Sequence, residues 1–453
     1  MSHHFVSIST LPAGGEKLDL SKFGKFISLL RLGAVIGLLA SAVIFLAGGA
    51  IKIGSTDFVT GEPISYSLRD VFSYSWLFAF YVFFTFALGG LFWVLLHNAS
   101  NSSWGVVIRR LPETLAVQLL PVFLLGLPLL FAPIRETLWT WMHDHHVALE
   151  GGKAATLPEA LHHSNHLLYH KLAYLSVWWH NWMPGFIPRF GIYFILLGLF
   201  AFILRGWSLS QDSTGDVRLT LLARKWSCGF LPLFAVSLTF AGFDWIKGLN
   251  YAWFSTMFGV NVFAGSALAT MALLIVIAVT LHENGYLKRL LTPEHTHLMG
   301  KLMHAFTIFW AYIAFSQYFL IWYANITEET QFYAIRNTDG WNFYSTFLIT
   351  IGHFFIPFVL LLPRAAKKNF KRIRAIALWI IFVHICEAYW FIIPERGPKL
   401  ADQPAIVWAV LLDAAAFITI GCVVALCFLK SLARYSLYPC GDPRLQESIN
   451  VVN

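Results

Sequence analysis

Charged residues are scarce in this sequence. Asp, Glu, Lys and Arg together account for 12% of the 453 residues, whereas hydrophobic residues account for 57%. So little charge cannot cover the surface of a water-soluble core of this size, which excludes a soluble globular protein. The formal net charge is +8. In so apolar a chain this excess indicates membrane topology and contact with anionic lipid rather than nucleic-acid binding.

Cysteine is also scarce, and its spacing matches no common metal or haem site. The five cysteines form neither a CxxC nor a CxxCH motif, which argues against covalent haem or an iron-sulfur cluster held by this chain. The patterns GxxxxGKS and GxGxxG are absent too, which argues against ATP-driven and nicotinamide chemistry. We therefore expect this chain to bind no redox cofactor of its own. The cysteines are Cys228, Cys386, Cys422, Cys427 and Cys440.

Long apolar runs dominate what the sequence does contain. A helix needs about 20 apolar residues to cross a bilayer, and lipid offers no partners for unpaired backbone groups, so helices are expected. The runs lie at about 29–51, 74–96, 115–133, 187–204, 228–246, 259–281, 302–324, 344–363, 374–394 and 406–430. The first run is longer than the apolar part of a signal peptide and follows a polar tail, so it should stay in the membrane. The sequence predicts an all-α integral membrane protein with about ten transmembrane helices.

The positions of Lys and Arg predict the orientation of these helices. If both termini lie inside, 22 of the 32 basic residues fall on inner tails and loops. Basic residues resist translocation, so they accumulate on the cytoplasmic side. The loop between the eighth and ninth runs, residues 364–374, has the strongest bias. We therefore expect both termini to be cytoplasmic.

A weak internal repeat suggests how the helices are grouped. The second run ends Leu96-His97-Asn98 and the sixth ends Leu281-His282-Glu283-Asn284, and a basic loop containing a proline follows each. Related units with an even number of spans have the same orientation in the membrane. This favours two four-helix bundles, spans 2–5 and 6–9, flanked by spans 1 and 10. The expected boundaries are an N-terminal cytoplasmic tail (1–28), the first span with its outer loop (29–73), bundle one (74–246), bundle two (259–394), the tenth span (406–430) and a C-terminal cytoplasmic tail (431–453).

A series of different polar and aromatic motifs lies along these spans. The motifs are Asp244-Trp245, His295-Thr296-His297, Gly300-Lys301, Trp310-Ala311-Tyr312, Ser316-Gln317-Tyr318 and Trp322-Tyr323-Ala324-Asn325, with Trp104, Arg109-Arg110, Glu113, His170-Lys171, Tyr174-Leu175, Trp253, Ser255-Thr256 and Phe258-Gly259 as further landmarks. In this order, over roughly residues 30–430, the chain resembles the ActF-type membrane subunit of bacterial alternative complex III. That complex is a quinol:electron-acceptor oxidoreductase, and the subunit belongs to the NrfD-like group of membrane proteins.

The resemblance implies a fold, a setting and a set of partners. It implies an NrfD-like double four-helix bundle without prosthetic groups, in the bacterial cytoplasmic (inner) membrane. The implied partners are a sister NrfD-like quinol-binding subunit, an iron-sulfur subunit, multihaem and monohaem cytochrome c subunits, small membrane subunits and membrane lipids. Haem c and iron-sulfur clusters would lie in these partners, and quinone or menaquinone is the implied small-molecule ligand. In the family pattern an Arg/Asp-like pair would occupy the positions of His384 and Glu387.

Ionisable residues within the apolar runs are the candidate functional residues, because a buried charge in lipid is costly unless it is paired, hydrated or neutralised. The candidates for a proton path are His353, His384, Glu387, Asp413, Asp244 and His304. His353 and His384 lie at similar depth on antiparallel spans, and Glu387 follows His384 on the same helix face. The competing interpretation makes these residues hydrogen-bond anchors between helices. A b-type haem between the two histidines is a further alternative, although the family carries none.

Histidines and aromatic residues also gather outside the spans. His162, His166 and His170 recur every four residues in the outer loop, a spacing that can hold a metal. We favour an interface with partner subunits for these histidines, because cysteine or carboxylate ligands are missing beside them. The tryptophans of this region, Trp139, Trp141, Trp178, Trp179 and Trp182, fit a membrane-interface belt. Arg109, Arg110 and Glu113 are expected on a charged helix at the headgroups.

The sequence therefore favours a subunit of a quinol-oxidising complex that serves as scaffold and has a possible proton-conducting or quinone-contacting role. High aromatic content, 17% of residues, suits a quinone pocket because planar rings stack on one another. The alternative is a stand-alone secondary transporter, which ten spans, a repeat and buried acids also allow. A transporter should show spans interrupted by Gly or Pro at mid-depth, and the fourth to ninth runs contain few such residues.

Overall fold

The computed structural model describes residues 6–12, 14–56, 63–150, 157–396 and 405–452. Among them, ten helices are long and apolar enough to cross a membrane. These spans are Leu20–Ala47, Leu68–Ala99, Arg110–Leu130, Phe186–Thr214, Val217–Leu249, Phe258–Glu283, Pro293–Ala324, Gly340–Leu361, Phe370–Arg396 and Val407–Ala433. They match the ten predicted runs in order. The prediction of an all-α, multi-pass membrane protein is confirmed.

The individual elements are as follows. The α-helices are α1 (Gly24–Ala47), α2 (Leu68–Ala99), α3 (Arg110–Ala116), α4 (Leu119–Gly126), α5 (Ala132–Leu138), α6 (Thr140–Glu150), α7 (Leu157–Ser164), α8 (His166–Lys171), α9 (Phe186–Thr214), α10 (Val217–Trp245), α11 (Phe258–Glu283), α12 (Pro293–Ala324), α13 (Thr327–Ala334), α14 (Asp339–Phe343), α15 (Ile356–Leu361), α16 (Arg364–Lys368), α17 (Phe370–Ile392), α18 (Ala405–Ala433) and α19 (Leu445–Ile449). The 3₁₀ helices are η1 (Ile8–Thr10), η2 (Leu20–Phe23), η3 (Trp104–Ile108), η4 (Leu127–Leu130), η5 (Lys247–Leu249) and η7 (Ile393–Arg396), and η6 (Tyr344–Phe355) is a π-helix. The strands β1 (Lys52–Thr56) and β2 (Pro63–Ser67) form one antiparallel hairpin, with Lys52 opposite Ser67, and β3 (Trp179–His180) and β4 (Met183–Pro184) form another.

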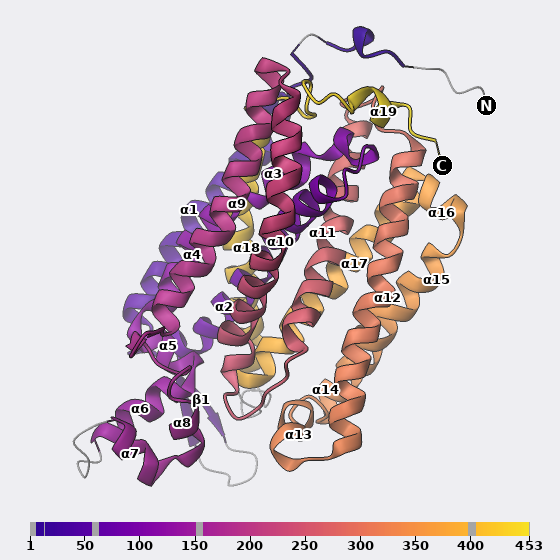
Figure 1. The fold of residues 1–453 in the computed structure, drawn as a ribbon. Helices are drawn as coiled ribbons and strands as arrows, with labels where there is room; N and C mark the ends of the chain where they lie inside the picture. Colours follow the sequence, from indigo (N-terminus) through magenta and orange to yellow (C-terminus); the bar gives the residue numbers. More distant parts are fainter. Residues whose placement is uncertain (1–5, 13, 57–62, 151–156, 397–404, 453) are drawn as a thin grey trace.

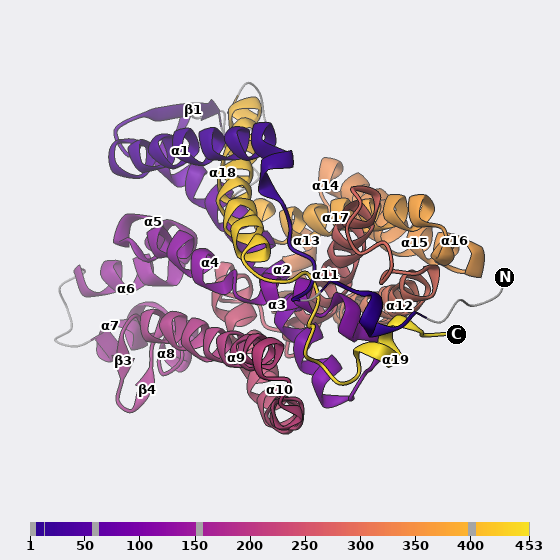
Figure 2. The ribbon, with the colours of Figure 1, turned by 90° about the horizontal axis from the view of Figure 1, so that it is seen from above.

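Helices α2 and α11 form the centre of the molecule. They are the most buried of the spans in the described chain and contact each other. Helices α3, α9 and α10 pack around α2, whereas α12 and α17 pack on α11. Figure 2 shows these two groups on opposite sides, with α1 beside α18 at a separate edge. The outer helices α1, α9, α12 and α18 expose apolar side chains such as Leu39, Ile195, Phe315 and Val407, as expected of helices surrounded by hydrocarbon.

The third span is broken into three short segments. Pro121 lies two residues inside α4 and supplies no N–H, so the carbonyl four residues before it, on Val117, loses its helical donor. Pro128 then begins the 3₁₀ turn η4. A proline inside a helix also clashes with the preceding turn, which explains why the chain changes from α3 to α4 to η4 here.

Both termini lie at one end of the helices, which we call the tail end, and α5–α8, α13 and α14 lie at the opposite loop end (Figure 1). At the tail end the two tails bind each other: Leu437 N donates to Glu16 O at 2.8 Å, and Val6 N donates to the Asn450 side chain at 2.9 Å. His295 at the start of α12 donates through Nε2 to Ser448 O at 3.0 Å. The tails thus form a cover over the ends of the central helices.

Arg109, Arg110 and Glu113 are buried at this tail end, so the prediction of a charged helix at the headgroups is wrong. Glu113 pairs with Arg109 at 3.2 Å and with Arg110 at 3.0 Å. Arg109 also binds Asp442 of the C-terminal tail at 2.5 Å, and Arg110 binds Asp212 at 2.5 Å. The charges remain inside because each has an opposite charge and hydrogen bonds, which offset the loss of hydration. Their pattern in the sequence did not reveal these distant partners.

Three of the five tryptophans predicted for an interface belt are exposed, and two are buried. Trp178, Trp179 and Trp182 surround the β3–β4 hairpin and are 60%, 61% and 82% exposed. This hairpin directly precedes α9, so it lies where a membrane-interface belt is expected. Trp139 and Trp141 are fully buried instead. They lie at the junction of α5 and α6, where both rings pack on Phe186.

Candidate functional site

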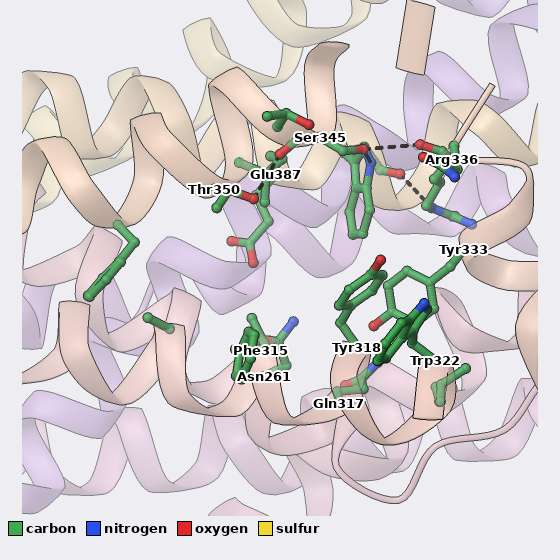
Figure 3. A pocket seen from close by; sticks show the side chains of 18 of the residues that line it. Asn261, Phe315, Gln317, Tyr318, Trp322, Tyr333, Arg336, Ser345, Thr350 and Glu387 are labelled. Atoms are coloured by element: carbon green, nitrogen blue, oxygen red, sulfur yellow. Dashed lines mark hydrogen bonds between the residues drawn. The ribbon is translucent and has the colours of Figure 1, made fainter. Parts of the chain in front are cut away.

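A pocket of about 810 Å³ lies between α12, η6 and α17 (Figure 3). Its walls come from α11, α12, α13, η6 and α17, and Trp310 and Glu387 are among the residues that line it. At the tail end α12 contacts α15 and α16, so the two sides of the pocket converge there. The volume falls within the range of small-molecule binding sites in proteins.

Aromatic side chains of α12 form the outer rim of the pocket. Tyr312, Phe315, Tyr318 and Trp322 line it and remain 65%, 64%, 46% and 62% exposed. An aromatic face that is both pocket wall and molecular surface gives the pocket a lateral opening toward the lipid. Rings at such an opening can stack on a planar ligand that arrives through the membrane.

A buried carboxylate lies at the deep end of the pocket. Trp310 Nε1 donates to Glu387 Oε1 at 2.6 Å, and His384 Nδ1 lies 3.2 Å from Glu387 Oε2. His353 Nδ1 lies 3.8 Å from the same oxygen. We call Glu387, His384, His353 and Trp310 the Glu387 cluster. It joins three of the residues predicted from the sequence to a tryptophan whose role the sequence did not indicate.

The Glu387 cluster is enclosed but not fully hydrogen-bonded. His353 is completely buried and stacks on the Trp310 ring at a centroid distance of 3.8 Å. Neither of its ring nitrogens has a hydrogen-bond partner among the described residues. His384 Nε2 lies 3.0 Å from Thr85 Oγ1 on α2, which links the cluster to the central helix. An imidazole with unused nitrogens beside a carboxylate is suited to exchange a proton.

Gly265 on α11 makes the room that the Glu387 cluster needs. A Cβ atom at this position would lie 3.1 Å from Glu387 Oε2 and 3.4 Å from the His384 ring. An alanine here would crowd the carboxylate, which would have to shift by a few tenths of an ångström. The absence of a side chain at Gly265 therefore sets how closely α17 approaches α11 at the site.

Two carboxamides extend the polar lining of the pocket. Asn261 is 4% exposed and Gln317 is 6% exposed, and both line the pocket. Asn261 Oδ1 and Gln317 Oε1 have no hydrogen-bond partner in the part of the chain that the structure describes. Buried polar atoms are usually satisfied, so two unused amide oxygens in one pocket favour a polar ligand group there. Gln317 belongs to one of the polar and aromatic motifs, whereas Asn261 gave no signal in the sequence.

Arg336 closes the loop end of the pocket and was not predicted. It is 1% exposed, donates to the carbonyls of Phe332, Trp390 and Phe391, and pairs with Glu395 at 3.0 Å. Burial lowers the pKa of this guanidinium to about 10, while the charge of Glu395 acts in the opposite direction. The group still carries its positive charge at neutral pH. It fixes the α13–α14 turn against α17.

The remaining predicted residues lie in separate networks. Asp244 accepts two hydrogen bonds from Arg189, both at 2.8 Å, and one from Tyr193 at 2.6 Å. Asp413 accepts two from Arg396, at 3.0 and 3.2 Å, and also binds Ser75 and Tyr389. His304 lies against the Phe358 ring, and its Nε2 has no described partner. The structure therefore brings His353, His384 and Glu387 together and leaves Asp244, Asp413 and His304 outside that cluster.

The outer-loop histidines do not form a three-ligand metal group within the described residues. His166 and His170 are exposed, and their Nε2 atoms lie 3.2 Å apart. His162 stacks edge-on against Tyr169 instead. The side chain of His163 lies outside the described part of the structure.

Comparison with known proteins adds no assignment to this site. The chain matches no protein-family model, and no curated protein matches it at a significant level. What the site can do must therefore be argued from its geometry. It combines a membrane-facing aromatic opening, unused amide oxygens and a buried carboxylate between two imidazoles.

Proposed function

We propose that this chain is an integral membrane subunit of a quinol-oxidising electron-transfer complex, of the ActF type found in alternative complex III. In this role its pocket binds the ring of a quinone or menaquinone, and the Glu387 cluster exchanges protons with it. The single observation that carries the proposal is the position of Glu387. Its carboxylate lines a lipid-facing aromatic pocket while contacting two buried histidines.

The pocket suits a quinone for three physical reasons. A quinone ring is planar and stacks on aromatic side chains such as those of Tyr318 and Trp322. Its isoprenoid tail is apolar and can remain in the lipid beside the exposed face of α12. Its two oxygens need hydrogen-bonding groups inside the pocket, where the amides of Asn261 and Gln317 lie.

Proton exchange follows from the surroundings of Glu387. Oxidation of a quinol releases protons, so a site that handles one needs a group that accepts them. Glu387 contacts the pocket on one side and His384 and His353 on the other, and His384 continues to Thr85. The family pattern has an Arg/Asp-like pair at the positions of His384 and Glu387. The side chains of histidine and glutamate can each accept and release a proton, so proton exchange is retained in this chain, whereas a fixed arginine–carboxylate salt bridge is not.

The setting of the subunit is part of the same proposal. The bias of Lys and Arg favours termini in the cytoplasm, and the resemblance to the ActF-type subunit implies the bacterial inner membrane. The packing of α3, α9 and α10 around α2, and of α12 and α17 around α11, supports the two four-helix bundles, spans 2–5 and 6–9. Electrons would pass through partners: the sister quinol-binding subunit, an iron-sulfur subunit with its clusters, and cytochrome c subunits with haem c.

Two experiments test this proposal. Purification of the native protein from its membrane, followed by haem spectroscopy and mass spectrometry, should recover multihaem and iron-sulfur polypeptides with it. Photo-crosslinking of that complex with an azido-quinone should label peptides of α12 and η6 in this chain. Labelling confined to a sister subunit would show that the quinone site does not lie in this pocket. A protein that purifies without haem-bearing partners would show that it is not a subunit of such a complex.

One observation favours the alternative function, a secondary transporter. The eighth span changes from the π-helix η6 to α15 beside Pro357, about three quarters of the way along the span, and the third span is broken, so two spans are irregular. Discontinuous spans are typical of transporter binding sites. Reconstitution of the isolated chain in liposomes decides the question. Solute or ion flux by this chain alone would support transport, and a tight vesicle would exclude it.

A further inference from the structure

The eighth span has an unusual backbone register along one wall of the pocket. Twelve residues, Tyr344–Phe355, form the π-helix η6. π-Helices pair each N–H with the carbonyl five residues earlier, are rare, and occur mostly as single turns at functional sites. Ile356 N donates to Ile351 O, and the Thr350 hydroxyl donates to Ser345 O at 3.1 Å, five residues back in both cases. So long a π-helix needs a specific cause.

Pro357 and the register together determine which carbonyl is left without a helical donor. Pro357 has no N–H. In the π register the carbonyl five residues before it, on Gly352, has no helical donor; in the α register it would be the carbonyl of His353, four residues before. The two registers therefore expose different carbonyls to the apolar surroundings. An unpaired carbonyl in apolar surroundings is destabilising. The more stable register is therefore the one whose open carbonyl finds a donor on another helix.

Trp379 of α17 supplies that donor to Gly352. Its Nε1 donates to Gly352 O at 2.8 Å. Gly352 is packed against α17: a Cβ atom there would lie 3.4 Å from Val383 Cγ1 and 3.6 Å from the Trp379 ring. A second indole of the same helix acts at the start of η6, where Trp390 Nε1 donates to Ser345 Oγ at 2.7 Å. Eleven residues separate the two tryptophans, about three helical turns, which places them on one face of α17.

We propose that Trp379 is a positioning residue for the pocket: its indole N–H pairs with the Gly352 carbonyl that Pro357 leaves open and so holds the eighth span in the π register. This register seats His353 against Trp310 beside Glu387. An α-helix turns further per residue than a π-helix, so conversion of η6 to an α-helix would rotate His353 away from its present neighbours. The rotation would be larger for Ile349 and Ser345, which lie further from α15. The consequence for ligand binding rests on the proposed function, whereas the register itself does not.

The variant Trp379→Phe tests the hydrogen bond while keeping an aromatic ring. Without the indole N–H, each register leaves one carbonyl unpaired, that of Gly352 in the π register and that of His353 in the α register. The π register then has no remaining advantage over the intrinsically favoured α-helix. A high-resolution electron cryomicroscopy structure of this variant in its native complex should therefore show η6 converted to α-helix and His353 displaced from Trp310. A variant structure that keeps the π register would overturn the proposal. Loss of packing alone would not change the register, so this readout separates positioning from general stability.

Thermal stability gives a second, independent test through Pro357→Ala. Alanine restores an N–H at position 357, which can donate to the Gly352 carbonyl in the π register or to the His353 carbonyl in the α register. Trp379→Phe should lower Tm by about 2–4 °C in the natural chain and by less than half as much in the Pro357→Ala background. The control is Trp226→Phe, at a ring that is 47% exposed on α10, which should change Tm equally and slightly in both backgrounds. Equal losses for Trp379→Phe in both backgrounds would refute the role of Pro357. No quinone is used, so failure here leaves the proposed function untouched.

Discussion

Trp310 donates its indole N–H to Glu387 at 2.6 Å, although 77 residues separate them in the chain. The bond holds one carboxylate oxygen, Oε1, and leaves the other, Oε2, to His384 and His353. One oxygen is therefore anchored and the other is placed for proton exchange. This division of roles leads to the first prediction.

Glu387→Gln should abolish proton exchange while preserving assembly. Glutamine has nearly the same shape, and its amide can still accept from Trp310 and donate to His384, so folding should be unaffected. It cannot take up a proton at neutral pH. We expect quinol-linked proton uptake by the purified complex in liposomes to fall about 100-fold, the lower range for loss of an acid-base group. The matched control is Glu283→Gln, at a partly exposed glutamate that pairs with Arg374 at the tail end. Normal uptake in Glu387→Gln with full turnover would contradict the proton role.

The fold was more predictable from the sequence than the site. Span length and apolarity depend on local composition alone, so all ten helices were found. The closeness of His384 and Glu387 followed from their spacing on one helix, and the matching depth of His353 followed from two antiparallel spans. Which face each helix turns inward depends on packing across the whole chain, so Trp310 and Asn261 could not be placed beside them.

The acidic residues also show that the sequence does not reveal which partners other helices supply. Asp244 and Asp413 looked like members of a proton path because they are acids in apolar runs. Their arginine partners, Arg189 and Arg396, lie at the ends of other helices, and only the folded structure shows that each acid receives several hydrogen bonds. The π register of the eighth span was also invisible, since Pro357 alone predicts a kink and the deciding donor, Trp379, comes from another helix.

Asp244→Asn should destabilise the protein strongly. The change removes the charge that balances Arg189, which is 6% exposed and whose other partners, the carbonyls of Tyr174 and Pro184 and the Tyr174 ring, are neutral. Breaking a buried ion pair from one side costs about 3–5 kcal/mol. We expect a large fall in Tm and in the yield of assembled protein. Asp216→Asn is the control, because Asp216 is an exposed N-cap of α10 and asparagine caps equally well. Equal stability of the two variants would show that the Arg189 pair contributes little.

Ala314→Trp should block the pocket without unfolding the chain. Ala314 lines the pocket from α12, and an indole there would occupy the space proposed for a quinone ring. We expect crosslinking of an azido-quinone to this chain to need at least roughly tenfold more ligand, which corresponds to about 1.4 kcal/mol of binding free energy. Ala305→Trp is the matched control, because Ala305 lies on the same helix and is exposed outside the pocket. If the two variants crosslink alike, the ligand lies elsewhere.

The α5–α8 region at the loop end should loosen as the pH falls below neutral. His145 on α6 is 4% exposed and packs edge-on against Trp141. Burial lowers the pKa of His145 to about 4; Asp144 raises it and His146 lowers it, both to a smaller extent. The unfolded segment takes up a proton near pH 6.5 and the folded one only near pH 4. The stability that depends on keeping His145 neutral is therefore fully present above pH 6.5 and is lost as the pH falls from 6.5 toward 4.

By pH 5 this loss amounts to roughly 2 kcal/mol, at about 1.4 kcal/mol per pH unit. Hydrogen exchange of α6 peptides, corrected for the intrinsic rates, should be about 30-fold faster at pH 5 than at pH 7.5, which is the same free energy expressed as an opening equilibrium. His145→Leu removes the titrating group and should abolish the difference. His143→Leu, at an exposed position on the same helix, should leave it intact. A pH effect that persists in His145→Leu would assign the loosening to another group.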